Sequence, residues 1–559
     1  MASNVLGVNA VFHDPASALV RDGRTVAAAE EERFSRRKHG KEPLAFSTWE
    51  LPEASARWCL RQGGIEPGEL DAVAYSYDPT LTDEHDAELT AADWEPLRTL
   101  YVRRAPLFLR TALPGLDPER VRFVPHHHAH AASAYLASGF DSCAVMTVDG
   151  RGEASSQLLG HVRGGELQVL AEQALPESLG LVYESLTAHL GFRRASDEYK
   201  VMALASYGVP AHLHELREYM QATGDGGFVA SAPDWERFAP PLGKGDRWTQ
   251  AHADLAASVQ RRLEEVLLEL ARWLYERTGE RRLAMAGGVA HNCVANSRLW
   301  REGPFDEVWV QPAAGDAGTA LGAALYVAHE LGNRVEPMGS AALGRGFSDA
   351  ELEAELERAA LPYERPVDVA MLAAETLARN GVVAWFEGRS EYGPRALGHR
   401  SLLADSRDEA NLERLNEVKG REQFRPVAPM TLTERAPEIF GDGPLPSPYM
   451  LFTHSVAPEW RERIPAVVHV DGTARVQTVD AAEEPQVAAL LQAFEQLTGV
   501  PVVVNTSFNT AGRPMVDSPI DALECFGSAP VDLLVLGPFA VRRAGSDAAE
   551  DALAEIAVA

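Results

Sequence analysis

The sequence has few cysteines, no long apolar run and little positive charge. Four cysteines occur among 559 residues without a CxxC pair, which favours reduced thiols in a cytoplasm over a disulfide framework. No stretch of about 18 apolar residues occurs, and the first residues show no charged-then-apolar leader, so we expect no membrane span and no signal peptide. The expected location is therefore the cytoplasm, without a membrane partner.

The excess of negative charge indicates which kinds of ligand the protein can bind. The chain has 52 Lys and Arg residues against 81 Asp and Glu residues, for a formal net charge of -29. Nucleic-acid phosphates are disfavoured as the main ligand, and a cationic small substrate is compatible with this charge. The length, with 46% hydrophobic residues, is enough for two or three domains with their own cores.

Two segments share the pattern of a strand, a tight polar turn and a returning strand. The first comprises Val5–Val8, a turn at His13–Pro15, Ala16–Val20 and Thr25–Ala29. The second comprises Ala144–Val148, a turn that contains Gly150 and Gly152, and a strand through Leu159. Such turns can hold phosphate groups against backbone N–H groups. The pair predicts an internal duplication, although each alone would be read as an ordinary turn.

Helical patterns and glycine turns follow. Apolar residues at spacings of three and four predict helices over Pro52–Gln62 and Ala251–Arg277. Two later segments, RRLAMAGGVAHNCVANSRLW and VWVQPAAGDAGTALGAALYVAHEL, each read as a strand, a glycine turn and a helix. Such units place helix N-termini beside a ligand, where anions are favoured.

The composition changes after a connector rich in glycine and proline at Asn333–Gly346. Beyond it we expect the following elements: a helix at Ala370–Asn380 and strands at Val382–Gly388, Val467–Val470 and Pro501–Val504. We place the boundary within about 15 positions of residue 355, which gives domains 1–354 and 355–559.

The segment VPHHHAHAASAY places four histidines within five positions. On a helix, His126 and His130 would share one face, as a site with two histidine ligands to a metal requires. Acidic ligands would have to come from distant turns, and Asp149 and Asp316 qualify because both follow predicted strands. The alternative is a solvated histidine cluster at the start of a helix.

Cations are concentrated late in this acidic chain. The group comprises Arg395, His399, Arg400, Lys419, Arg421 and Arg425. Cations beside Gly, Pro and apolar residues often bind phosphate or carboxylate, but a salt-bridged surface is the alternative. The turn NTSFNT adds hydroxyl and amide donors for a small polar group.

These segments together resemble the antibiotic and nodulation-factor O-carbamoyltransferases. The chain is also similar to the tRNA threonylcarbamoyl-transfer proteins and the hydrogenase-maturation carbamoyltransferase. The resemblance rests on FHDPASALVRDG, HHHAH, TVDGRGE, GGVAHNCVANSRL, GDAGTALGAAL, GPRALGHRSLLADSR, KGREQFRPVAPM and NTSFNTAGRP, in the family's order. It covers nearly the whole chain.

The resemblance implies an α/β fold with two domains. The first would be a duplicated actin/sugar-kinase-like (ribonuclease-H-like) domain for metal binding, nucleotide binding and carbamoyl transfer. The second would be a threonylcarbamoyl-AMP-synthase-like domain that activates carbamoyl phosphate. The implied metal ligands are His126, His130, Asp149 and Asp316. The implied metal is Fe(II), although such mixed ligands also suit zinc or manganese.

The resemblance also assigns substrate-binding residues. Nucleotide binding would fall to Gly287, Gly288, Asn292 and Gly150. Carbamoyl phosphate would be bound by Lys419, Arg421, Arg425, Arg475, Ser507 and Asn509. ATP would be a substrate together with magnesium.

The implied reaction makes carbamoyl-adenylate and then transfers its carbamoyl group to an acceptor hydroxyl. A base must take the hydroxyl proton. We expect His13 in this role, oriented by Asp14, with packing or capping as the alternative role of His13. Lys200 and Lys38 are lesser candidates for phosphate or carbonyl contacts.

The sequence is compatible with several classes of hydroxyl-bearing acceptor. The acidic balance favours a polycationic aminoglycoside over ansamycins, cephems or nodulation oligosaccharides. Rival functions are a sugar kinase, a tRNA threonylcarbamoyl-type transferase and a non-catalytic assembly protein of the actin class. Paired histidines argue against the kinase, and the absence of basic arms argues against tRNA binding. The sequence does not decide the oligomeric state.

Overall fold

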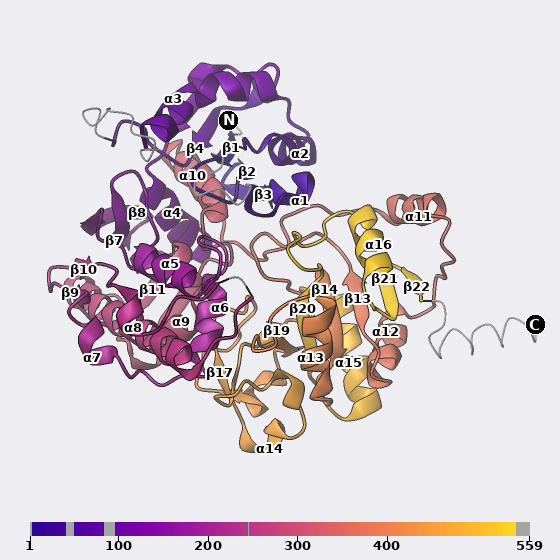
Figure 1. The fold of residues 1–559 in the computed structure, drawn as a ribbon. Coiled ribbons are helices and arrows are strands. Elements are labelled where there is room, and N and C mark those ends of the chain that lie inside the picture. The colour runs from indigo at the N-terminus through magenta and orange to yellow at the C-terminus, as the bar shows by residue number, and fades with distance from the viewer. Residues whose placement is uncertain (1–2, 41–49, 83–94, 244, 544–559) are drawn as a thin grey trace, which may run out of the picture. The chain divides into compact units, whose positions relative to one another are not determined.

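The computed structural model describes residues 3–40, 50–82, 95–243 and 245–543 (Figure 1). The chain divides into two compact units, Met1–Leu343 and Gly344–Ala559. This division lies before residue 355, because Gly344 and Arg345 already pair with the second unit. The N–H of Gly344 donates to the Ser390 carbonyl over 2.8 Å, and the N–H of Ser390 donates to the Arg345 carbonyl over 2.8 Å.

The first sheet of the N-terminal unit has the strand order β3-β2-β1-β4-β5. Its strands are β1 (Asn4–Asn9), β2 (Ala16–Arg21), β3 (Arg24–Glu30), β4 (Ala72–Tyr75) and β5 (Val121–Phe123). β2 is antiparallel to β1 and β3, whereas β4 is parallel to β1 and β5. The predicted strands and turn of this segment are confirmed. The turn at His13–Pro15 follows the C-terminal end of β1.

The second sheet repeats this arrangement with the order β12-β11-β6-β7-β8. Its strands are β6 (Ser142–Val148), β7 (Ser155–Arg163), β8 (Glu166–Ala174), β11 (Arg282–Ala286) and β12 (Glu307–Val310). β7 is antiparallel to β6 and β8, whereas β11 is parallel to β6 and β12. Equal order and equal directions in two sheets confirm the predicted duplication.

Each half contributes a helix to the other half's sheet. α4 (His126–Ser138) follows β5 but packs on β6, β7 and β11, while α10 (Ala317–Glu330) follows β12 but packs on β1, β2 and β4. The two helices also pack against each other. Glycine makes this approach possible, because a Cβ at Gly322 would overlap the Ala129 carbonyl of α4. The exchange brings the start of α4 near the start of α10.

The predicted helices of this unit are confirmed as α2 (Glu53–Gly63) and α8 (Gln250–Thr278). The first glycine-turn unit continues into α9 (Cys293–Glu302), and the second continues into α10. In the described residues, no helix is long and apolar enough to cross a membrane. All four cysteines are buried and none forms a disulfide.

The C-terminal unit is built on a sheet with the order β19-β15-β20-β14-β13-β21-β22. Its strands are β13 (Val383–Phe386), β14 (Arg400–Asp405), β15 (Ala428–Leu432), β19 (Gln477–Val479), β20 (Val503–Ser507), β21 (Leu533–Leu536) and β22 (Phe539–Arg542). Helices α12 (Val369–Ala378) and α15 (Pro485–Thr498) pack together beside it. The α/β class is therefore confirmed in both units.

The strand predicted at Val467–Val470 is wrong. Pro465–Val467 forms a 3-10 helix, and the chain then turns before the short β18 (Thr473–Ala474). Val467 is buried in the core, so its apolar character reflects packing and not strand pairing. The prediction at Pro501–Val504 overlaps β20, which begins two residues later at Val503.

Candidate active site and metal centre

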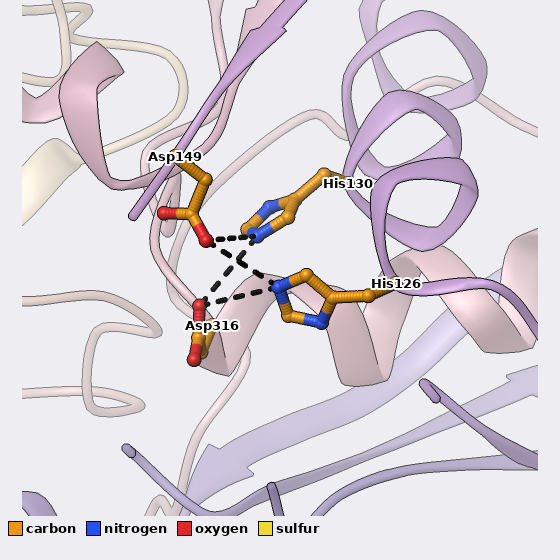
Figure 2. A group of neighbouring side chains, drawn as sticks. All are labelled: His126, His130, Asp149 and Asp316. Carbon is orange, nitrogen blue, oxygen red and sulfur yellow. Dashed lines mark ion pairs between the residues drawn. The ribbon is translucent and has the colours of Figure 1, made fainter. Parts of the chain in front are cut away.

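The first two turns of α4 carry the two histidines that were predicted to share a face. The helix begins at His126, directly after Pro125. The N–H of His126, which lacks a partner inside the helix, donates to Glu153 Oε1 over 2.9 Å. The side chains of His126 and His130 are fully buried and point the same way (Figure 2).

Asp149, which follows β6, and Asp316, which lies between β12 and α10, complete the group. Nε2 of His126 lies 3.5 Å from Asp149 Oδ2 and 3.6 Å from Asp316 Oδ1. Nε2 of His130 lies 3.8 Å and 3.6 Å from the same two oxygens. The four potential ligand atoms lie within 4.8 Å of one another (Figure 2). The structure thus brings together all four residues predicted as metal ligands.

Three of these four ligand atoms have no hydrogen-bond partner among the described residues. They are Nε2 of His126, Nε2 of His130 and Oδ1 of Asp316, and all three are buried. An unsatisfied buried polar atom costs about 1–3 kcal/mol. Ligand atoms around a tetrahedral ion with bonds of about 2.2 Å lie about 3.6 Å apart, which agrees with the observed spacing. The group therefore fits a divalent metal, and its donors do not select among iron, zinc and manganese.

The charges of the group also suit a cation. Burial opposes ionisation of Asp149, but the neighbouring His126 and His130 hold its pKa well below the usual range. Burial acts in the same way on Asp316, where His13 and the two histidines lower the pKa to about 2. Both aspartates are therefore carboxylates, which is the form that binds a metal.

The neighbouring His127 has a different environment. Its side chain is buried, and Nδ1 lies 3.1 Å from the Ser155 hydroxyl. Burial, together with His126, lowers the pKa of His127 to about 3. Glu153, which the sequence did not indicate, accepts the N–H groups of Asp78 over 2.7 Å and of His126. His127 and Glu153 thus support the turn and the helix that present the metal group.

The predicted base lies beside this group. His13 is 24% exposed, and its Nδ1 lies 2.8 Å from Asp14 Oδ2. Its Nε2 lies 3.6 Å from Asp316 Oδ2. This is the carboxylate oxygen that does not face His126. The structure therefore brings His13 and Asp14 together at the edge of the cluster.

Lys200 lies near an acidic and an aromatic side chain. Its ammonium lies 3.1 Å from Asp197 and 5.4 Å from the centre of the Phe192 ring. Glu198, two residues before Lys200, was not among the residues predicted for the site. Burial, reinforced by Glu184, raises the pKa of Glu198 to about 7. Lys38 lies in the short 3-10 helix Lys38–Gly40, next to His39.

The residues expected to bind nucleotide surround the end of β6. The N–H of Gly288 donates to Asp149 Oδ1 over 2.7 Å, which joins this turn to the metal group. Asn292 caps α9 by accepting the Ala295 N–H over 3.0 Å, and it exchanges hydrogen bonds with Gln260. Gly150 lies close to Glu184, since an added Cβ would come within 3.2 Å of its carboxylate.

Gly287 provides a stability prediction. Its φ of 94° lies in the left-handed region, and an added Cβ would overlap the Val148 carbonyl. We expect Gly287→Ala to lower the thermal midpoint by several degrees and to weaken metal retention, because the turn carries Gly288 onto Asp149. Calorimetry and elemental analysis would measure both effects. Gly499→Ala is the control for φ, because Gly499 has a φ of 73° but no atom within 4 Å of an added Cβ. Equal effects of the two substitutions would contradict the steric explanation.

The C-terminal unit holds a second polar cluster around Lys419, which is only 6% exposed. Its Nζ donates to Ser507 Oγ over 3.0 Å and to Asn509 Oδ1 over 2.5 Å, with further contacts to the carbonyls of both residues. Ser507 Oγ donates to Asn509 Oδ1 over 2.9 Å. Three of the six residues predicted to bind carbamoyl phosphate are thus in direct contact.

The other three are placed differently. Arg421 donates from Nε to Asn416 Oδ1, and Arg425 lies 3.5 Å from Glu422. Asn416, at the end of α13 (Ala410–Val418), also donates to the Arg425 carbonyl over 3.1 Å. This asparagine, absent from the prediction, fixes the loop that carries both arginines. Arg475 follows β18, and its Nε is buried without a hydrogen-bond partner among the described residues.

Arg400 lies in the core among backbone carbonyls. The side chain is fully buried, its guanidinium carbon lies 3.6 Å from the centre of the Phe386 ring, and its donors reach several carbonyls. His399 is also buried, and its Nε2 lies 3.2 Å from Glu484. The concentration of cations in the sequence thus mixes structural residues with candidate ligands.

Comparison with known proteins agrees with the two units. Residues 4–116 and 108–325 match the family described as "Carbamoyltransferase N-terminus", and residues 374–543 match "Carbamoyltransferase C-terminus". The chain is 40% identical over 554 residues to nodulation protein NolNO of Sinorhizobium fredii, covering 96% of this chain and 80% of that protein. It is 32% identical over 555 residues to nodulation protein U of Rhizobium tropici, covering 90% of each.

A solved structure, HypF of T. kodakarensis, aligns with 59% of this chain and 48% of its own at 14% identity and a TM-score of 0.35. The family matches together span both units, and the relatives match along most of their length. The chain therefore belongs to the carbamoyltransferase family and is an enzyme that transfers carbamoyl groups.

Proposed function

We propose that the enzyme is an ATP-dependent O-carbamoyltransferase with two sites. The C-terminal unit converts carbamoyl phosphate and ATP to carbamoyl-adenylate, and the N-terminal unit moves the carbamoyl group to a hydroxyl of a small molecule. The observation that supports this division is that the buried His/Asp group and the Lys419 cluster lie on different units.

The proposed first reaction begins with hydrolysis of carbamoyl phosphate by water to carbamate and phosphate. The resulting carbamate attacks the α-phosphorus of ATP, which enters with magnesium, and pyrophosphate leaves. Lys419, Arg421 and Arg425 would neutralise phosphate charge, with Arg475 as a further cation. Ser507 and Asn509 would hold Lys419 in place and offer hydrogen bonds to the carbamoyl group.

The proposed transfer occurs at His126, His130, Asp149 and Asp316. A divalent metal held there, Fe(II) in our proposal, would polarise the adenylate or hold its phosphate. The glycine turns at Gly287–Gly288 and Gly150, with Asn292, would bind the adenosine part. His13 Nε2 would take the proton of the acceptor hydroxyl while its oxygen bonds to the carbamoyl carbon, and AMP would leave.

The proposed acceptor is a polyhydroxylated natural product, and the net charge of -29 favours a cationic aminoglycoside. The nodulation proteins among the relatives make an oligosaccharide the second candidate. Carbamoylation of an uncharged oligosaccharide in preference to tobramycin or kanamycin would decide for the second candidate.

The nucleotide product separates this function from its main rival. A sugar kinase would release ADP, whereas transfer from carbamoyl-adenylate releases AMP and pyrophosphate. We expect AMP formation to require both carbamoyl phosphate and an acceptor, and the acceptor to gain the mass of one carbamoyl group in place of a hydrogen. Nucleotide chromatography and product mass spectrometry would measure this. ADP with a phosphorylated acceptor would refute the proposal, and carbamoylation of tRNA would favour the threonylcarbamoyl-type alternative.

A further inference from the structure

Asp14 is shared between two imidazoles. Its Oδ2 lies 2.8 Å from His13 Nδ1, and its Oδ1 lies 2.7 Å from His39 Nδ1. The second ring continues the chain of contacts, because His39 Nε2 lies 2.9 Å from the Ser196 hydroxyl. Three separate segments, the β1–β2 turn, residues 38–40 and the residues before α6 (Glu198–Ala205), therefore meet through one carboxylate.

The direction of these hydrogen bonds follows from the charge of Asp14. Burial opposes ionisation, but His39 and His13 hold the pKa of this carboxyl well below its usual range. A carboxylate only accepts, so both imidazoles must donate from Nδ1. A neutral His13 then keeps its lone pair on Nε2, the atom that faces Asp316. A neutral His39 likewise accepts on Nε2, so Ser196 donates to it.

The backbone around His39 holds this ring against the turn. The N–H of His39 donates to Glu32 Oε2 over 2.8 Å, and its carbonyl accepts the Asp14 N–H over 3.3 Å. A Cβ at the neighbouring Gly40 would come within 2.5 Å of the Pro15 ring. Asp14, Glu32 and His39 could together hold an ion. Hydrogen bonds already engage these side chains, in contrast to the unpartnered atoms at His126 and His130.

We propose that His39 is a positioning residue for His13. By occupying Oδ1 of Asp14, it keeps Oδ2 directed at His13 Nδ1 and so keeps the lone pair of His13 on Nε2. Ser196 holds the far side of the His39 ring and links this arrangement to the segment before α6. The inference rests on the proposed role of His13 as the proton acceptor in carbamoyl transfer.

Two substitutions of nearly equal shape test the donor role. His39 has a φ of 61°, a conformation that Asn and Asp tolerate better than most residues. The Nδ2 of asparagine can replace His Nδ1 as a donor, whereas aspartate can only accept and would repel Asp14. We expect His39→Asn to keep kcat for transfer within about 5-fold and His39→Asp to lower it about 100-fold, with KM for the acceptor nearly unchanged.

The assay supplies purified carbamoyl-adenylate to metal-loaded, full-length enzyme with a carbamoylated acceptor as the readout. Pyrophosphate release and metal content should stay unchanged in both variants, and His214→Ala, which removes an exposed histidine on α7 (Leu213–Leu216), is the control. Equal kcat for the Asn and Asp variants would overturn the inference. If His13→Ala abolishes transfer but His39→Asp does not, only the role of His39 fails. If His13→Ala itself transfers normally, the proposed base is wrong.

Discussion

Replacing either His126 or His130 with alanine should release the metal and stop carbamoyl transfer. Each substitution removes one of two nitrogen donors and leaves Asp149 and Asp316 facing each other in a buried space. Loss of residues that merely support a metal ligand costs about 10- to 100-fold in affinity or activity, so loss of a ligand should cost more. Carbamoyl-adenylate synthesis should persist at least in part, because we assign it to the other unit.

The measurement is elemental analysis of purified variants, combined with transfer from supplied carbamoyl-adenylate. His127→Ala is the matched control on the same helical turn, since its ring contacts Ser155 and lies outside the four-residue group. Losing this buried ring should lower thermal stability through a cavity, and it should lower metal content and transfer less than loss of either ligand does. Full metal occupancy in both His126→Ala and His130→Ala would remove these residues from the proposed centre.

The parts of the fold that depend on short apolar runs and turns could be predicted from the sequence. Alternating and continuous apolar runs identified β1, β2, β3 and β6, and similar turns in both halves indicated the duplication. Apolar character did not decide the structure at Val467–Val470, because Val467 is buried in the core without belonging to a strand. The division at Gly344 falls inside the connector Asn333–Gly346, and its exact position depends on pairing with Ser390, which is distant in sequence.

The metal group was predictable because helix periodicity places His126 above His130 and because carboxylates at strand ends commonly reach a shared edge. The residues that support this group, Glu153 and His39, could not be predicted from the sequence. Glu153 acts by accepting the N–H of His126, and His39 acts by holding Asp14, so both roles depend on contacts between distant segments. A carboxylate or imidazole carries the same local signal whether it faces solvent or a buried N–H.

The cation-rich segment that contains Arg400 and Lys419 was also only partly interpretable from local sequence. Local sequence cannot distinguish Arg400, which donates to carbonyls inside the core, from Lys419, which meets side-chain oxygens of the NTSFNT turn. The pairing of β20 with both β14 and β15 brings the NTSFNT turn into this part of the unit. Lys419 is therefore the cation for which burial and polar neighbours together favour an anion site.

Lys419→Met should block carbamoyl-adenylate synthesis while sparing transfer. Methionine keeps most of the side chain's volume but removes the ammonium that contacts Ser507 and Asn509. Loss of one buried charge-assisted contact costs about 1.5–3 kcal/mol, or roughly 10- to 150-fold in rate. Arg425→Ala should act in the same direction but less strongly, because its guanidinium already lies 3.5 Å from Glu422. Arg358→Ala, an exposed arginine on α11 (Asp349–Arg358), is the control within the same unit.

The test follows the two half-reactions separately. Pyrophosphate release from carbamoyl phosphate and ATP reports activation, and carbamoylated acceptor from supplied carbamoyl-adenylate reports transfer. Lys419→Met and Arg425→Ala should fail in the first assay and succeed in the second, whereas His13→Ala should show the reverse. His13 contacts Asp14 and Asp316 in the N-terminal unit, so its loss removes the proposed proton acceptor without touching the Lys419 cluster. Loss of the same half-reaction in all three variants would contradict the two-site mechanism, and a single active centre would then explain the enzyme better.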